Sequence, residues 1–94
     1  VASVLLAARA AGSSARGALN VRYDESVVEA LEAVGDTAVE FDAEAAVDTA
    51  VADALADDAD ADVVYQTGGT GVEPVVYLLG PDAVTVAERA RDIL

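Results

Sequence analysis

Short apolar segments with a period of two alternate along this chain with longer segments of helical spacing. The strand-like segments span residues 18–23, 37–41, 62–66 and 75–79. In the first of them, Leu19, Val21 and Tyr23 share one face because side chains alternate across a strand. The first and last helical stripes include Val1 and Leu94. This pattern predicts a small layered α/β domain of about four strands and four helices, in the order α-β-α-β-α-β-β-α, with a mixed sheet.

Acidic residues stand where the later helices are expected to begin. Asp24 and Asp42 can accept hydrogen bonds from the unpaired backbone N–H groups of a first turn, and Asp82 stands at the start of the last helix. Within that last helix, Arg89 and Asp92 are three residues apart. We therefore expect these two side chains to pair on its exposed surface.

The residue types that the chain lacks exclude several kinds of chemistry. It has no Cys, which removes disulfides and thiolates, and no His, which removes the commonest acid–base group at neutral pH and a common metal ligand. No apolar run reaches the roughly 18–20 residues that span a bilayer, so no membrane partner is expected. Because a chain without Met has no initiator, we expect residues 1–94 to be a single-domain fragment whose N-terminal part is missing.

Charge points to the solvent in which the domain works. Eighteen acidic residues against five basic ones give a net charge of −13, and Lys is absent. Such a balance argues against direct binding of nucleic acid, which needs clustered cations. The pattern is similar to that of cytoplasmic proteins of extremely halophilic archaea, in which concentrated salt screens the repulsion between carboxylates. The alternative is an ordinary acidic domain with a solvated surface. Cytoplasmic localisation is the expectation in either case.

A glycine-rich loop, Gly68-Gly69-Thr70-Gly71-Val72-Glu73-Pro74, separates the last two predicted strands. Glycine allows positive φ and a close approach of the backbone to a ligand, and successive N–H groups in such a loop can bind an anion. The loop lacks the Gly-Lys-Ser/Thr of a phosphate-binding P-loop, and no helix follows it directly. A simple turn between two strands is therefore the alternative.

Two polar side chains share one face of the first strand. Asn20 and Arg22 alternate with Leu19, Val21 and Tyr23, so both can reach one ligand. Arg22 is the only cation between Arg16 and Arg89, and its guanidinium suits a pair of phosphate oxygens. The alternative is a structural ion pair with one of the many carboxylates.

Together these two motifs resemble the ThiN-type thiamine-phosphate synthase domain over residues 1–94. That family has an Ala-Met-Asn-Ile-Arg-Tyr strand, a Gly-Gly-x-Gly-Lys-Glu-Pro loop, an apolar strand and a final helix. The counterparts here are 18–23, 68–74, 75–80 and the helix that follows Pro81. The resemblance implies a domain that joins hydroxymethylpyrimidine diphosphate to thiazole phosphate, or that senses thiamine phosphates behind a helix-turn-helix domain.

The resemblance also implies which residues would form the site. Phosphate or substrate binding falls to Asn20, Arg22, Gly68, Gly69, Gly71 and Glu73, with Arg22 as the catalytic residue and no metal-ligand set in the protein. Mg²⁺ is implied as a cofactor only if the domain is an enzyme. Apart from this small-molecule ligand, homodimerisation stays open as a partner interaction.

Two departures from the family pattern favour a sensor over an enzyme. Val72 stands where the family loop has Lys, and no Gly-Ser-Thr stretch is found near 47–54. We therefore expect the ligand-sensing domain of a thiamine-responsive transcriptional regulator. The first alternative is a thiamine-phosphate synthase domain, with or without a fused hydroxymethylpyrimidine phosphate kinase, and the second is a domain that kept the fold and lost the site.

Overall fold

The computed structural model describes residues 2–42 and 44–93, which form four helices and four strands in the expected order. Val1 and Leu94, which were assigned to the first and last helices, lie outside the described residues. None of the helices in the described residues has both the length and the apolar character that a membrane crossing requires. In chain order the elements are α1 Ala2–Ala10, β1 Gly17–Arg22, α2 Glu25–Ala33, β2 Ala38–Glu40, α3 Val47–Leu55, β3 Val63–Gln66, β4 Val75–Gly80 and α4 Ala83–Ile93.

The strands form one mixed sheet in the order β1-β4-β3-β2. β4 lies in the centre and is antiparallel to both β1 and β3, while β2 is parallel to β3. The parallel pair needs a crossover connection, which α3 provides, and the antiparallel pair β3–β4 needs only the glycine-rich hairpin. The mixed sheet predicted from the sequence is therefore confirmed.

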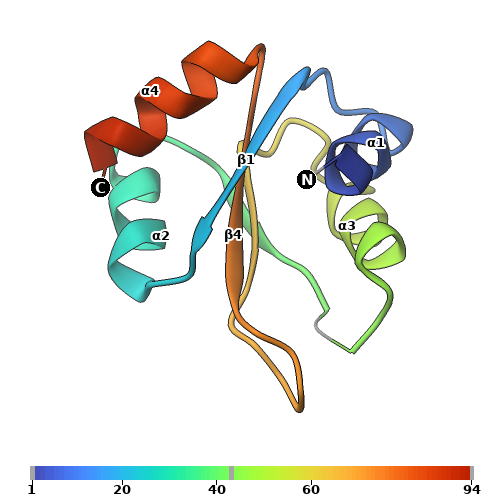
Figure 1. The fold of residues 1–94 in the computed structure, drawn as a ribbon. Coiled ribbons are helices and arrows are strands. Elements are labelled where there is room, and N and C mark those ends of the chain that lie inside the picture. Colours follow the sequence, from blue (N-terminus) through green and yellow to red (C-terminus); the bar gives the residue numbers. More distant parts are fainter. Residues whose placement is uncertain (1, 43, 94) are drawn as a thin grey trace.

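Helices cover both faces of this sheet, with α2 and α4 on one side and α1 and α3 on the other (Figure 1). Because the side chains of each strand alternate, neighbouring residues of β3 and β4 belong to different cores: Val63 packs with α2 and α4, whereas Val64 packs with α1 and α3. Both valines are fully buried. The domain is thus a three-layer α/β/α sandwich.

The helix starts follow the prediction at two of three acidic residues. The carboxylates of Asp24 and Asp82 accept hydrogen bonds from Ser26 N (2.9 Å) and Thr85 N (2.7 Å), and these bonds lower the pKa of both carboxyls. The prediction for Asp42 is wrong. Its carboxylate accepts from Glu44 N at 2.8 Å and so closes a turn, and α3 begins only at Val47, without a side-chain cap.

The expected pair between Arg89 and Asp92 is replaced by a longer-range contact. Arg89 donates to the carboxylate of Asp36 and to the carbonyl of Leu79, each at 2.7 Å. The side chains of Arg89 and Asp36 are only 25% and 17% exposed. Arg89 therefore joins α4 to β4 and to the turn after α2, and it is a structural residue.

Candidate functional site

A cavity of about 740 Å³ opens on the α1/α3 side of the sheet, where β1 and β3 end and β4 begins. At this edge Arg22 is exposed at the end of β1, whereas Gln66 is buried at the end of β3. The lining residues come from β1, β3, β4 and the segment just before β4: Asn20, Val21, Arg22, Gln66, Glu73, Pro74, Val75 and Tyr77.

Strand register fixes how the side chains of this cavity lie relative to one another. Arg22 and Gln66 both pair with Val75, one from each side, so the three residues form one row across the sheet. Asn20 pairs with Tyr77 in the next row that faces the same side of the sheet, two residues further along. Two strand spacings separate Arg22 from Gln66, which places their Cα atoms about 10 Å apart. Val75 therefore lies between a cation on one side of the cavity and an amide on the other.

Arg22 is exposed and available to a ligand. Among residues 2–42 and 44–93 it has no carboxylate within ion-pair distance, since the ion pair found there is Arg89–Asp36. The alternative interpretation of Arg22, a structural ion pair, is therefore not observed in the described residues. The guanidinium can offer two parallel N–H donors to phosphate oxygens, and the described residues place no other cation in the lining of the cavity.

Gln66 is the residue that sequence reasoning missed. It is 5% exposed, and it is the single buried polar side chain in the described part of the chain. Its Oε1 atom has no hydrogen-bond partner among residues 2–42 and 44–93, which costs on the order of 1–3 kcal/mol in a buried position. A polar residue that ends the apolar strand Val63–Gln66 next to the glycine-rich loop is the signal that could have found it.

The glycine-rich loop extends away from the sheet as a hairpin (Figure 1). Gly69 and Val72 exchange both backbone hydrogen bonds, at 3.1 and 3.0 Å, so the N–H of Gly69 is used inside the turn. Gly68 and Gly71 have positive φ values of 96° and 71°, which only glycine adopts readily. None of these three glycines lines the cavity, and their predicted role in ligand binding stays a prediction.

Three of the six predicted site residues therefore meet at one place. Asn20, Arg22 and Glu73 line the same cavity although they are distant in sequence. Glu73 is the only carboxylate in the lining, and no group of three potential metal ligands exists among residues 2–42 and 44–93. This donor set fits a magnesium ion that is held mainly by the phosphates of its substrate, as Mg²⁺ commonly is.

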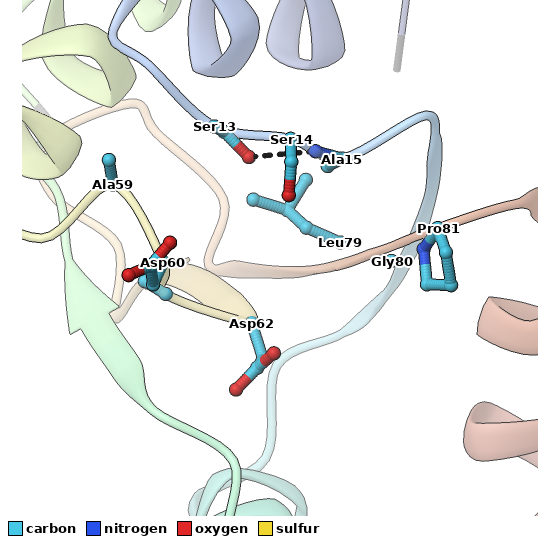
Figure 2. A pocket seen from close by; sticks show the side chains of 10 residues that line it. Ser13, Ser14, Ala15, Ala59, Asp60, Asp62, Leu79, Gly80 and Pro81 are labelled. Carbon is cyan, nitrogen blue, oxygen red and sulfur yellow. Dashed lines mark hydrogen bonds between the residues drawn. The ribbon is translucent and has the colours of Figure 1, made fainter.

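A second cavity, of about 160 Å³, lies at the opposite end of the sheet, where β4 ends (Figure 2). Asp60 and Asp62 contribute carboxylates to its lining, and no cation does. One carboxylate oxygen of Asp62 already accepts from Thr37 N at 3.0 Å, and Ser13 Oγ accepts from Ala15 N at 3.1 Å. Phosphate binding is disfavoured beside these carboxylates, so the larger cavity is the candidate site.

Comparison with known proteins agrees with the sequence resemblance. The family described as thiamine-phosphate synthase ThiN matches residues 1–92. A curated relative from Methanothermobacter thermautotrophicus, named thiamine-phosphate synthase ThiN, is 35% identical over 91 residues. That alignment covers 84% of this chain and 48% of the relative, so the chain spans about half the length of the protein it matches.

Two crystal structures share the fold. The C-terminal domain of a phosphomethylpyrimidine kinase superposes with a TM-score of 0.82 at 19% identity, over 99% of this chain and 59% of that one. The C-terminal domain of a second protein superposes with a TM-score of 0.81 at 23% identity, over 98% of this chain and 54% of that one. At these identities the likeness concerns the fold alone. The family match and the curated relative carry the assignment: the chain belongs to the ThiN thiamine-phosphate synthase family.

Proposed function

We propose that this domain is part of a thiamine-phosphate synthase and that the cavity beside Arg22 binds the phosphorylated substrates. The observation that carries the proposal is the position of Arg22, an exposed guanidinium with no carboxylate partner in the described residues, at a cavity of about 740 Å³. The floor of that cavity includes Val75 and the ring of Tyr77, which suit a flat heterocycle. The curated synthase relative supports the same reaction.

The proposed reaction moves charge onto the phosphate that leaves. The bond between the pyrimidine methylene and the diphosphate oxygen breaks, its electron pair leaves with the diphosphate, and the thiazole nitrogen forms the new bond to that methylene. Arg22 would stabilise the departing charge, and Asn20 would hold and orient the substrate in the same cavity. Glu73 would hold a magnesium ion against the diphosphate, where the metal supplies further neutralisation.

The sensor function expected from the sequence is the second candidate. It rests on Val72, which replaces the Lys of the family loop and leaves the hairpin without a cation. The synthase relative favours turnover instead, because its name describes an enzyme. The cavity would serve either function, since both require binding of a phosphorylated thiamine precursor or product.

Calorimetry with inorganic pyrophosphate and with thiamine phosphate tests the binding part of the proposal. In the intact protein in concentrated KCl, Arg22→Ala should weaken both ligands tenfold or more, because a charge-assisted hydrogen bond is lost. Arg91→Ala is the matched control, because Arg91 is an exposed cation on α4 outside the cavity lining. Equal effects of the two substitutions would remove Arg22 from the site.

A turnover assay then separates the synthase from the sensor. The intact protein should release pyrophosphate from hydroxymethylpyrimidine diphosphate in the presence of thiazole phosphate and magnesium, and Arg22→Ala should reduce that rate strongly. Binding of thiamine phosphate without turnover would support the sensor. Failure of the intact protein to bind any of these ligands would mean that the fold was retained and the site lost.

A further inference from the structure

We propose that Gln66 recognises the aminopyrimidine half of the substrate, through hydrogen bonds between its side-chain amide and the amino edge of the ring. This inference rests on the proposed function and adds a specificity residue to the same cavity. Gln66 is the last residue of β3, is 5% exposed, and lines the cavity that Arg22 also lines.

The Oε1 atom of the Gln66 amide lacks a hydrogen-bond partner in the described part of the chain, which is unusual for a buried polar group. No hydrogen bond to Oε1 is found within the described residues, and the atom is inaccessible to solvent, so the side chain has to rotate for this oxygen to face the cavity that Gln66 lines. Buried amides normally satisfy their donors and acceptors inside the protein, and the exceptions call for a specific explanation. An apolar side chain would pack at this position without that cost. A ligand that completes the hydrogen bonds gives the amide a function.

The chemistry of the amide selects the kind of ligand group that it can bind. An amide offers one acceptor and two donors, and rotation about its last torsion exchanges the oxygen and the nitrogen. The edge of a 4-aminopyrimidine offers an exocyclic N–H donor next to a ring-nitrogen acceptor. A glutamine amide pairs with such an edge through two hydrogen bonds, as it does with adenine in nucleic acids. A thiazole ring has no amino group and cannot form this pair.

The geometry of the row places the two recognition groups at opposite sides of one ligand. Arg22 and Gln66 lie on either side of Val75, with Cα atoms about 10 Å apart. A pyrimidine with a phosphorylated arm can bridge this separation, with its ring over Val75 and Tyr77 and its phosphates toward Arg22. The register therefore favours the pyrimidine diphosphate, rather than the thiazole phosphate, as the ligand of this row.

Calorimetry on the intact protein tests this assignment with three probes. They are hydroxymethylpyrimidine diphosphate, its analogue with hydrogen in place of the amino group, and inorganic pyrophosphate. Unsubstituted protein should prefer the amino compound over the analogue about tenfold or more. Gln66→Leu should abolish this preference and leave pyrophosphate binding unchanged. Thr67→Val is the control, since Thr67 is the adjacent exposed residue outside the lining, and it should keep the preference.

The outcomes separate the inference from the function on which it rests. A preference that survives in Gln66→Leu, or that is absent from the unsubstituted protein, overturns the assignment of Gln66. If in that case Arg22→Ala still weakens pyrophosphate binding, the proposed function stands. Pyrophosphate binding that does not depend on Arg22 overturns the function itself. Thermal melting checks that Gln66→Leu is folded, and Gln66→Met replaces it if it is not.

Discussion

The two faces of the sheet differ most where β1 and β3 end. On the α2/α4 side, the rings of Tyr23 and Tyr65 stack with centroids 6.2 Å apart and planes 16° apart. Burial raises the pKa of the Tyr65 hydroxyl above its usual value, and the nearby Glu40 and Glu32 carboxylates add to this effect. On the α1/α3 side the same strand ends stay open and carry a cavity instead.

The side chains on the packed face and those on the open face belong to neighbouring residues of the same strands. Arg22 precedes Tyr23, and Gln66 follows Tyr65, so alternation sends the aromatic side chains to one face and the polar ones to the other. A shift of one residue in strand register would exchange the two sets. Packing on the closed face therefore fixes the register that presents Arg22 and Gln66 on the open face.

Salt concentration should act on both the fold and the open face, and the loss of the fold at low salt is the largest effect that we expect. The domain measures 31 × 27 × 21 Å, and the screening length is about 3 Å in 1 M salt but about 30 Å in 10 mM salt. At low salt, repulsion among the carboxylates behind the net charge of −13 therefore spans the whole molecule, and helical circular dichroism should be lost. A signal unchanged down to tens of millimolar salt would contradict this prediction.

While the protein remains folded, the same titration should weaken phosphate binding. Lower salt unscreens the attraction between Arg22 and a phosphate, but it also unscreens the repulsion between the anionic ligand and the net charge of −13. Pyrophosphate affinity measured by calorimetry should therefore fall as KCl is lowered toward the unfolding range. An affinity that rises as KCl is lowered would contradict this prediction.

The next largest effect should come from shortening a buried side chain on the α2/α4 side of the sheet. Leu78 is 1% exposed and packs with α2 and α4, so Leu78→Ala should lower the free energy of unfolding by about 2–5 kcal/mol. On the open face, Gln66→Leu removes an unpartnered polar group and should cost no stability. Denaturant titration of both variants measures the change in the free energy of unfolding that each substitution causes. Equal destabilisation by the two substitutions would contradict this prediction.

A smaller loss of stability should follow from Arg89→Ala. This substitution removes the ion pair with Asp36 and the hydrogen bond to the Leu79 carbonyl, which together contribute about 1–2 kcal/mol in a partly exposed position. Pyrophosphate binding should not change, because Arg89 does not line the cavity. Arg91→Ala should change neither the free energy of unfolding nor the affinity for pyrophosphate. Weakened pyrophosphate binding in folded Arg89→Ala would show that the two ends of the sheet are coupled.

The smallest predicted effect concerns the start of α4 and depends on pH. The Thr85 N–H group lowers the pKa of the Asp82 carboxyl below its usual value of 3.8, so the charged form is stabilised in the folded state. This stabilisation is present above the unfolded pKa and is lost as the pH falls through the lower, folded value. Asp82→Ala should therefore lower the melting temperature at pH 7, with a difference that narrows below pH 3.8. A difference that stays constant with pH would exclude the carboxylate cap.

Local patterns predicted the elements of the fold well, because alternation and helical spacing can each be recognised within a short segment of the sequence. Asp24 and Asp82 were identified as caps for the same reason. Asp42 was not predicted correctly, since its nearest N–H donor is Glu44 in a turn rather than the first turn of α3. Arg89 was assigned to the surface because its partner, Asp36, is 53 residues away along the chain.

The candidate site shows the same division between local and long-range information. The alternation of β1 alone places Asn20 and Arg22 on one face, as the cavity confirms. Gln66 joins them only through the order β1-β4-β3, which no single segment encodes. The expectation for the loop glycines came from composition, whereas the hairpin that uses the Gly69 N–H depends on how the loop folds back to Val72.

Nuclear magnetic resonance of the intact protein during titration with thiamine phosphate tests the central claim most directly, because it locates the ligand on the sheet. We predict shifts that concentrate at the open strand ends, including the backbone of Arg22 and Val75 and the side-chain amide of Gln66. Shifts that concentrate instead around the smaller cavity, at Asp60 and Gly80, would contradict the account, as would a spectrum that does not change.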